Sequence, residues 1–161
     1  MNFNIECPIN PLSLGQVSVG VLVELYKRGL HPNIYNIGNV DLSVYNLPEG
    51  FVEWLQIRVK HAIRNIGKKL PTIAIWHING SHKKIASNKN VLWTAHECDS
   101  LTNVEKSICS LYDKVLVTSE WSNEVFNANG VKSEICNNFF DSNSFFKKDI
   151  RKQEGVTNFL L

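Results

Sequence analysis

The sequence lacks the features that would place it in a membrane, secreted or disulfide-rich class. No apolar run in its 161 residues approaches the ~20 residues that a membrane-spanning helix needs. The N-terminus has no basic segment followed by a long apolar core, so we expect no secretory signal peptide. The four cysteines show no paired spacing, which favours reduced thiols in a cytoplasmic protein over a disulfide framework.

Strong charge of one sign is missing too. The net charge is +2 and the lysines look scattered along the chain, so electrostatics give no reason to expect binding to nucleic acid. Neither an internal repeat nor a low-complexity segment is evident. The composition, with 43% hydrophobic and 20% charged residues, is that of an ordinary globular chain long enough for one buried core.

Short apolar runs alternate with helical patterns along the chain. The run at residues 72–76 shows no polar–apolar alternation, as in a strand that helices cover on both faces. Strands are expected at residues 3–7, 33–37, 72–76, 91–95, 115–118 and 134–136. The pattern predicts the α/β class, with a Rossmann-like, open, mostly parallel sheet, right-handed crossovers and helices on both faces.

Helices are expected between these strands. One should span residues 17–30 and stop at Gly29, and another should span residues 46–66. The second has the clearest apolar stripe, made of Phe51, Leu55, Val59, Ala62, Ile63 and Ile66.

Two further helices have clear start signals. Thr102 and Glu105 form a capping-box pattern, and the helix that follows is expected to bury Val104, Ile108 and Leu111. Ser119 is expected to cap the last helix, which should end at Gly130.

Reactive side chains gather in residues 91–121. The strand 91–95 runs into His96-Glu97-Cys98-Asp99, and the strand 115–118 runs into Ser119-Glu120-Trp121. His77 follows the strand 72–76 in the same way. Because the carboxyl ends of parallel strands meet at one edge, we expect these groups to share that edge of the sheet.

Each of these side chains admits more than one role. His77 and His96 could donate to a sugar hydroxyl, act as a base or bind a metal, or simply bond a nearby backbone carbonyl. Glu97 could be a base, a hydroxyl acceptor or a helix cap. No ligand pair here has the local spacing of a known metal motif, so we expect no metal, and Cys98 is interpreted as structural.

A glycine loop follows the first strand. Gly15, with Gln16 and Ser18 after it, precedes the expected helix, where a backbone can approach a phosphate or sugar. The dinucleotide fingerprint G-x-G-x-x-G is absent, and a plain turn glycine is the alternative.

Three segments together resemble the glycosyltransferases of the GT-B fold, notably the retaining family-four group. LYDKVLVTSEW is similar to that family's phrase "aD-x-v-x-v-p-S-e-w", and TAHECDSL is similar to the segment before its acceptor-site loop. NNFFDSNSFF resembles "p-n-G-v-D-x-x-x-F", with Phe139-Phe140 in place of Gly-Val. The glycine loop and the helix end LYKRGL also resemble family features, although this loop has fewer glycines.

The resemblance implies a function and a division into domains. Residues 1–150 would be the acceptor-side Rossmann-like domain, and residues 151–161 would be a linker and the first strand of a donor-binding domain that is missing here. The whole enzyme would move a sugar from a nucleotide-sugar, its co-substrate, to a glycan or other hydroxyl acceptor, with retention and without a metal or other cofactor. The donor domain could lie in the same chain or in a partner, and a peripheral membrane contact is left open.

The resemblance also assigns roles to residues. His96 would bond the transferred sugar and Glu97 would hold the acceptor hydroxyl, which makes them the catalytic pair. Donor-phosphate or substrate binding would fall to Gly15, Gln16, Ser18, His77, Ser119 and Glu120. Two alternatives stay open: a stand-alone module that binds glycans or pairs with a partner, and a flavodoxin-like protein that binds a phosphate ligand.

Overall fold

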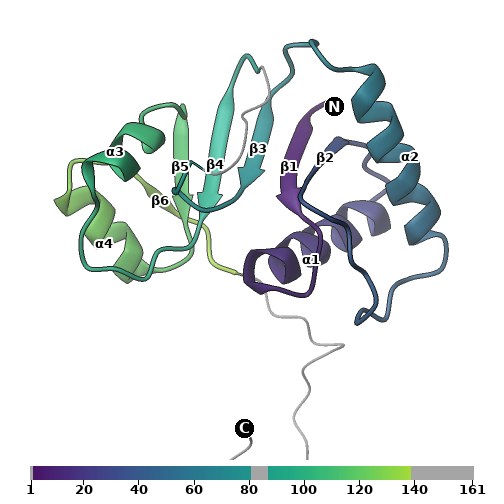
Figure 1. The fold of residues 1–161 in the computed structure, drawn as a ribbon, viewed down its shortest axis with the longest axis horizontal. Helices are drawn as coiled ribbons and strands as arrows, with labels where there is room; N and C mark the ends of the chain where they lie inside the picture. The colour runs from purple at the N-terminus through teal and green to yellow at the C-terminus, as the bar shows by residue number, and fades with distance from the viewer. Residues whose placement is uncertain (1, 81–86, 139–161) are drawn as a thin grey trace, which may run out of the picture.

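A single parallel sheet organises the fold. The structure, a computed structural model, describes residues 2–80 and 87–138 (Figure 1). Its six strands lie in the order β2-β1-β3-β4-β5-β6, and every pairing is parallel. The strands are β1 (Asn4–Pro8), β2 (Asn33–Ile37), β3 (Thr72–Ile75), β4 (Asn90–Thr94), β5 (Lys114–Val117) and β6 (Glu134–Ile135). The predicted Rossmann-like α/β class is confirmed, and each strand lies within one residue of its expected bounds.

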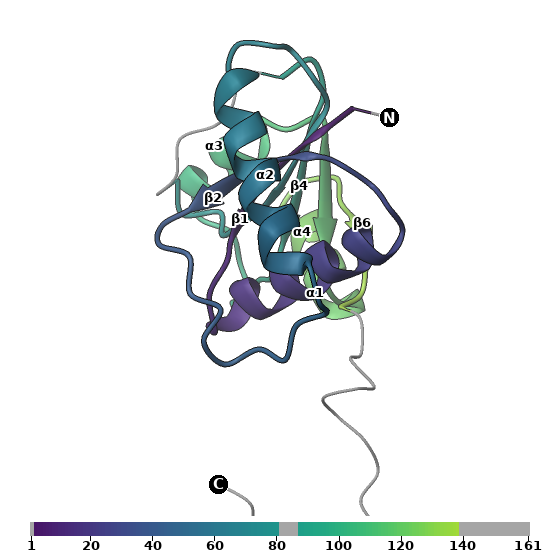
Figure 2. The same ribbon diagram turned by 90° about the vertical axis from the view of Figure 1, so that its right-hand side faces the viewer.

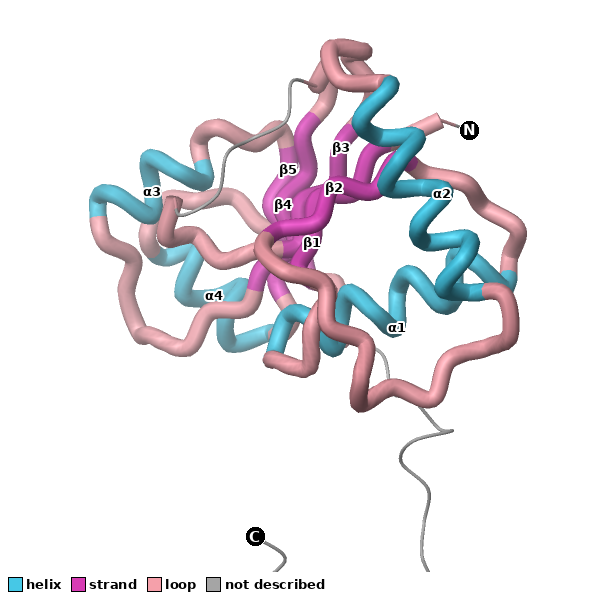
Figure 3. Tube along the Cα trace, turned by 45° about the vertical axis from the view of Figure 1, so that its right-hand side comes forward, coloured by secondary structure: helices cyan, strands magenta, loops and turns pink. Residues whose placement is uncertain are grey.

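The helices cover both faces of the sheet. They are α1 (Ser13–Lys27), α2 (Phe51–Arg64), α3 (Asn103–Cys109) and α4 (Glu120–Ala128). Successive residues of β3 point to opposite faces: Ile75 packs in a cluster with Leu22 of α1, whereas Ala74 packs in a cluster with Phe126 of α4. The sheet therefore separates a core under α1 and α2 from a core under α3 and α4 (Figure 3).

The strand order reverses beside β1. The chain goes from β1 to β2 on one side and then returns to place β3 on the other. In open α/β sheets, ligands bind at the carboxyl ends of the strands near such a reversal. That edge lies at the bottom of Figure 1, where α1 follows β1.

A buried polar row joins the first residues of three strands at the opposite, amino edge. The amide of Asn33 donates to Asn4 Oδ1 at 2.9 Å, and the amide of Asn4 donates to Thr72 Oγ1 at 3.2 Å. All three side chains are buried. Because each buried polar group has a partner here, the row sets the pairing of β2, β1 and β3 without a large desolvation penalty.

The first two helices start at different residues than predicted. α1 begins at Ser13 instead of residue 17, and α2 begins at Phe51 instead of residue 46. Neither start has a side-chain cap, because Leu12 and Gly50 occupy the cap positions. Figure 2 shows α2 running along the β2 edge, with α1 beside its start.

The buried face of α2 matches the expected stripe in part: Phe51, Leu55 and Ala62 are buried as predicted. Trp54 is 7% exposed and joins the core, whereas Ile63 and Ile66 are 63% and 69% exposed. The helix is rotated toward Trp54 because that ring packs on Tyr26 of α1, with 5.6 Å between the ring centroids.

In the second half, the helix starts are as predicted and the buried residues are not. The capping box of Thr102 and Glu105 is present, and Ser119 caps α4. Val104 and Leu111 are 65% and 60% exposed, so their predicted burial is wrong. α3 has only 7 residues and presents Cys109 to the core instead.

The predicted linker and strand at residues 151–161 lie outside the described residues, so the division into domains stays a prediction. Among the described residues, no helix is long and apolar enough to cross a membrane.

Candidate functional site

The carboxyl edge of the sheet brings together the loops that the sequence singled out. His77 follows β3, His96 follows β4 and Ser119 follows β5, and these three strands are neighbours. The loop that leads into α1 follows β1 at the same edge (Figure 1). The side chains in these loops differ greatly in exposure, and exposure decides which of them can meet a ligand.

Gly15 lies inside the first turn of α1 rather than in a loop before it. The residue is buried, and a Cβ at this position would lie 2.3 Å from both the backbone oxygen and Oδ1 of Asn10. Its N–H donates to the Leu12 carbonyl at 2.6 Å. The glycine is therefore needed for the chain to fold back on itself between β1 and α1, and its predicted role as an approach to phosphate is not supported by this placement.

The two polar residues after Gly15 point in different directions. Gln16 is exposed, and its amide donates to the Pro11 carbonyl at 2.7 Å. Ser18 is fully buried, and its hydroxyl donates to the Leu14 carbonyl at 2.7 Å. Ser18 thus faces the core rather than a ligand.

Ser18 also contacts the buried thiol of Cys7. Burial raises the pKa of Cys7 from 9.0 to about 12, and a hydrogen bond with Ser18 offsets part of that rise. The thiol stays neutral and is sealed in the core under α1.

His96 is held inside the protein. Its side chain is 9% exposed, and Nε2 lies 3.2 Å from the Ser100 carbonyl. The ring packs edge-on against Phe126, with 5.4 Å between the centroids. These contacts match the alternative of a histidine bonded to a nearby carbonyl. His96 thereby links the start of the loop 96–101 to Ser100 near its end.

Ser122 fixes the other end of this loop and was missed by the sequence analysis. The buried hydroxyl of Ser122 donates to the His96 carbonyl at 3.1 Å. Ser119 caps α4 by accepting from the Ser122 N–H at 3.1 Å, and its hydroxyl donates to Ser122 Oγ at 2.9 Å. The sequence did contain a signal for this contact, because Ser119 and Ser122 lie three residues apart after β5. A cap serine and a serine at this spacing can also form hydrogen bonds to groups outside the helix.

The carboxylates at this edge are exposed. Glu97 and Asp99 protrude from the loop 96–101, and Glu120 lies in the first turn of α4. His77 is exposed as well, with its ring 5.4 Å from that of Trp76. A ligand at the carboxyl edge can therefore reach three predicted site residues, His77, Glu97 and Glu120, and the neighbouring Asp99.

Glu105 connects the candidate edge to α3. Burial acts to raise its pKa, but hydrogen bonds from the N–H and hydroxyl of Thr102, together with the nearby His96, outweigh burial and lower the pKa. The two bonds to Glu105 Oε2 measure 2.7 and 2.8 Å. The ionised carboxylate therefore anchors the point where the loop 96–101 enters the helix.

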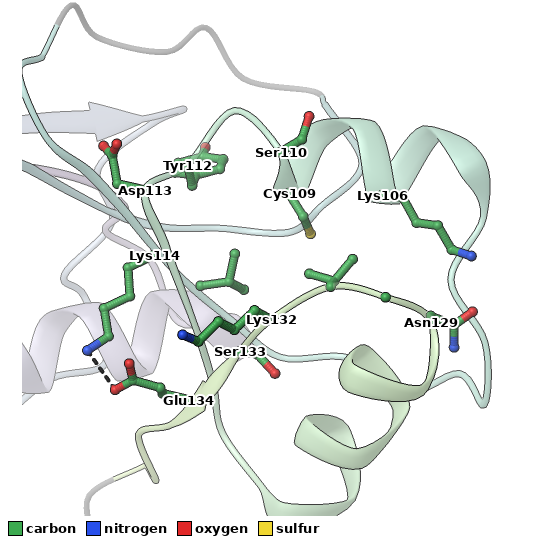
Figure 4. A pocket seen from close by; sticks show the side chains of 13 residues that line it. Lys106, Cys109, Ser110, Tyr112, Asp113, Lys114, Asn129, Lys132, Ser133 and Glu134 are labelled. Carbon is green, nitrogen blue, oxygen red and sulfur yellow. Dashed lines mark ion pairs between the residues drawn. The ribbon is translucent and has the colours of Figure 1, made fainter.

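A groove lies at the opposite edge of the sheet, away from these residues. It measures about 420 Å³ and lies between the ends of α3 and α4 and the starts of β5 and β6 (Figure 4). Three lysines and two acids line it, and Lys114 pairs with Glu134 at 2.6 Å. Both helices point their C-termini, and hence partial negative charge, into it, which makes it a poor site for the anionic part of a nucleotide.

Within residues 2–80 and 87–138, no group of three or more His, Cys, Asp and Glu side chains could hold a metal ion. Neither the models of known protein families nor the curated protein sequences give a match to this chain.

Proposed function

We propose that this chain is the acceptor-side, Rossmann-like half of a GT-B glycosyltransferase, which moves a sugar from a nucleotide-sugar to a hydroxyl acceptor. The observation that carries the proposal is the carboxyl edge of the sheet, where the exposed carboxylates Glu97 and Glu120 follow the neighbouring strands β4 and β5, and His77 follows β3 next to the strand-order reversal. The resemblance supports it: the phrase that matches the family corresponds to β5, Ser119 and the start of α4.

The residues at this edge have different roles in the proposed reaction. Glu97, exposed on the loop 96–101, accepts a hydrogen bond from the acceptor hydroxyl and orients it for transfer. His77 and Glu120 contact the substrate from either side of that loop. His96 acts as a positioning residue, because its buried ring and its carbonyl hold the loop that carries Glu97.

The start of α1 is the part that faces the donor phosphates. No side chain caps this helix, and its first turn has no acidic residue, so its dipole favours an anion. Gly15 supports this geometry from inside. In a retaining transfer the donor phosphate serves as the base, so Glu97 acts by orientation.

Binding to the chain tests this proposal. We expect nucleotide-sugars such as UDP-glucose or GDP-mannose to shift backbone amide NMR signals of residues 10–16, and a glycan acceptor to shift those of residues 96–101. Glu97→Gln should weaken the affinity for the acceptor, measured by titrating these shifts, about tenfold. This is the size of one hydrogen bond to a charged group. Glu124→Gln, an exposed change in the body of α4, should leave this affinity unchanged.

Three outcomes would contradict the proposal. Shifts confined to the groove of Figure 4 would move the ligand to the opposite edge. Glycan binding without any response to nucleotide-sugars would favour a stand-alone binding module. Robust sugar transfer by the 161-residue chain would refute the division of labour, because the proposal leaves most of the donor site to another domain.

A further inference from the structure

The outer surface of α2 presents apolar side chains that no part of the described chain covers. Ile63 and Ile66 are 63% and 69% exposed, the largest values among the exposed apolar residues of this helix and its end. The turn continues past the helix, since the Ile66 N–H lies 3.4 Å from the Ile63 carbonyl. Spacing of three residues places both on one side of the helix.

Positive charge is concentrated in the same part of the chain. Residues 54–96 contain eight Lys and Arg and no Asp or Glu, whereas the rest of the chain has nine Lys and Arg against fifteen Asp and Glu. The net charge of +2 is thus the sum of +8 and −6. The small net charge therefore hides a basic segment, because the acids all lie outside residues 54–96.

The fold gathers part of this charge around the two isoleucines. The loop before β3 and the loop before β4 are joined, since the Thr72 N–H donates to the Lys89 carbonyl at 2.8 Å and the Ser87 hydroxyl donates to the Leu70 carbonyl at 2.7 Å. Residues 65–71, before β3, and residues 87–89, directly before β4, lie at the amino edge, where α2 ends (Figures 1 and 3). We call this surface the basic pole; its exposed residues are Lys60, Ile63, Arg64, Ile66, Lys68, Lys69 and Lys89.

We propose that the basic pole binds the surface of an anionic lipid bilayer. Lysines around exposed aliphatic side chains match both parts of such a surface, the charged headgroups and the start of the acyl region. The pole lies at the amino edge, opposite the candidate sugar edge, so a bound bilayer would leave the loop 96–101 accessible.

Other occupants fit this surface less well. Protein interfaces are depleted in lysine and rely on aromatic anchors, and the pole has no aromatic residue. A second copy of the chain would bring like charges together. A nucleic acid would meet the lysines but would have no use for the exposed isoleucines.

Sedimentation with lipid vesicles tests the proposal. We expect the chain to bind vesicles that contain phosphatidylglycerol, to ignore vesicles of pure phosphatidylcholine, and to be released by high salt. Lys68→Gln with Lys69→Gln should weaken binding about 25-fold, at about fivefold for each charge near an anionic surface. Ile63→Ser with Ile66→Ser should weaken it about tenfold or more through lost apolar burial.

Matched controls come from the other half of the molecule. Val104→Ser with Leu111→Ser removes equally exposed apolar side chains from α3 and the turn after it, and Lys106→Gln with Lys132→Gln removes two charges from the groove. Both pairs should bind vesicles within about twofold of the parent chain, because neither changes the basic pole.

Several results would overturn the proposal. Equal binding to neutral vesicles, or equal losses in the control pairs, would remove the role of the basic pole. A concentration-dependent dimer that is lost in the isoleucine variant would assign the surface to a second copy. Binding to an RNA homopolymer that needs the lysines and not the isoleucines, without vesicle binding, would assign it to nucleic acid. None of these results depends on sugar binding at the other edge.

Discussion

The two halves of this sheet are held by different kinds of contact. In the half that contains β4, α3, β5 and α4, each helix begins at a side-chain cap. Thr102 caps α3 and Ser119 caps α4, and each cap bonds a residue only three positions later. In the half that contains β1, α1, β2 and α2, neither helix has such a cap. There the helices are longer, 15 and 14 residues, and they contact each other through an aromatic cluster of Tyr26, Phe51 and Trp54.

The start of α2 shows how distant residues replace a cap. Gly50 precedes the helix with φ of 78°, and a Cβ there would lie 2.9 Å from the Tyr26 hydroxyl. That hydroxyl donates to the Glu49 carbonyl at 2.7 Å. A residue of α1 thus sets where α2 begins. The first half should therefore be sensitive to changes in packing, and the second half to changes in local hydrogen bonds.

The largest expected effect comes from the aromatic cluster. Trp54→Ala should lower the free energy of unfolding by about 4 kcal/mol, because it removes a buried ring that packs on Tyr26 and Phe51. It also removes the indole N–H that donates to His31 Nδ1 at 3.2 Å. Urea unfolding followed by circular dichroism measures the loss.

Trp121 is the matched control in the second half. It lies in the first turn of α4 and is 46% exposed, so Trp121→Ala should change stability by no more than about 0.5 kcal/mol. Similar losses in the two variants would mean that the halves do not differ as their packing implies.

The next largest effect is expected at the turn between β1 and α1. Gly15→Ala would place a Cβ 2.3 Å from two oxygens of Asn10 and should destabilise the protein by about 3 kcal/mol. Gly29→Ala is the control: it has a φ of 64° but open space around it, so only a backbone penalty of about 1 kcal/mol is expected. If both variants lose the same small amount in urea unfolding, the contact with Asn10 does not constrain the turn.

A pH titration compares the thiols buried in the two cores. Burial raises the pKa of Cys7 from 9.0 to about 12 and that of Cys109 from 9.0 to about 11. Because the unfolded thiols ionise first, the contribution of these two thiols to stability should be constant below pH 9.0 and should be lost as pH rises above it, through the folded pKa values.

Each thiol should contribute a loss of about 1.4 kcal/mol per pH unit above its unfolded pKa. Cys7→Ala should be less stable at neutral pH but show a shallower fall between pH 9 and pH 10 by about that slope. Cys98→Ala, which changes an exposed thiol, should keep the full slope. An unchanged slope in Cys7→Ala would show that this thiol is not sealed in the folded state.

The same contrast explains what the sequence could and could not predict. The strands were placed within one residue, because apolar runs between turn signals are local features. The starts of α3 and α4 were predicted from Thr102 and Ser119, whose capping acts within three residues. The starts of α1 and α2 were not, since Asn10, before α1, constrains the first and Tyr26, a residue of α1, constrains the second.

The candidate site divides in the same way. Chain order alone predicted that His77, His96 and Ser119 would follow neighbouring strands. The bond from His96 to the nearby Ser100 carbonyl is local, and the sequence left it open as an alternative. The burial of the ring could not be predicted, because Phe126 reaches it only when α4 docks on the sheet. Ile63 and Ile66, the last two residues of the predicted stripe on α2, were expected in the core for a related reason: Trp54 packs against α1, and the two isoleucines face outward.

The smallest expected effect is at the cap of α3, which also anchors the loop that carries Glu97. Thr102→Ala should cost about 1 kcal/mol at neutral pH, since it removes the hydroxyl that accepts from the Glu105 N–H at 3.2 Å and donates to Glu105 Oε2 at 2.8 Å.

The pKa of Glu105 is lowered in the folded state, so its ionised form stabilises the protein above the unfolded carboxyl pKa, and this contribution is lost as pH falls. The difference between Thr102→Ala and the parent chain should therefore shrink in acid, whereas Ser107→Ala, an exposed change on the same helix, should stay within about 0.5 kcal/mol at every pH. A pH-independent loss of several kcal/mol in Thr102→Ala would mean that this half too depends on long-range packing, and that the loop 96–101 is held mainly by His96 and Ser122.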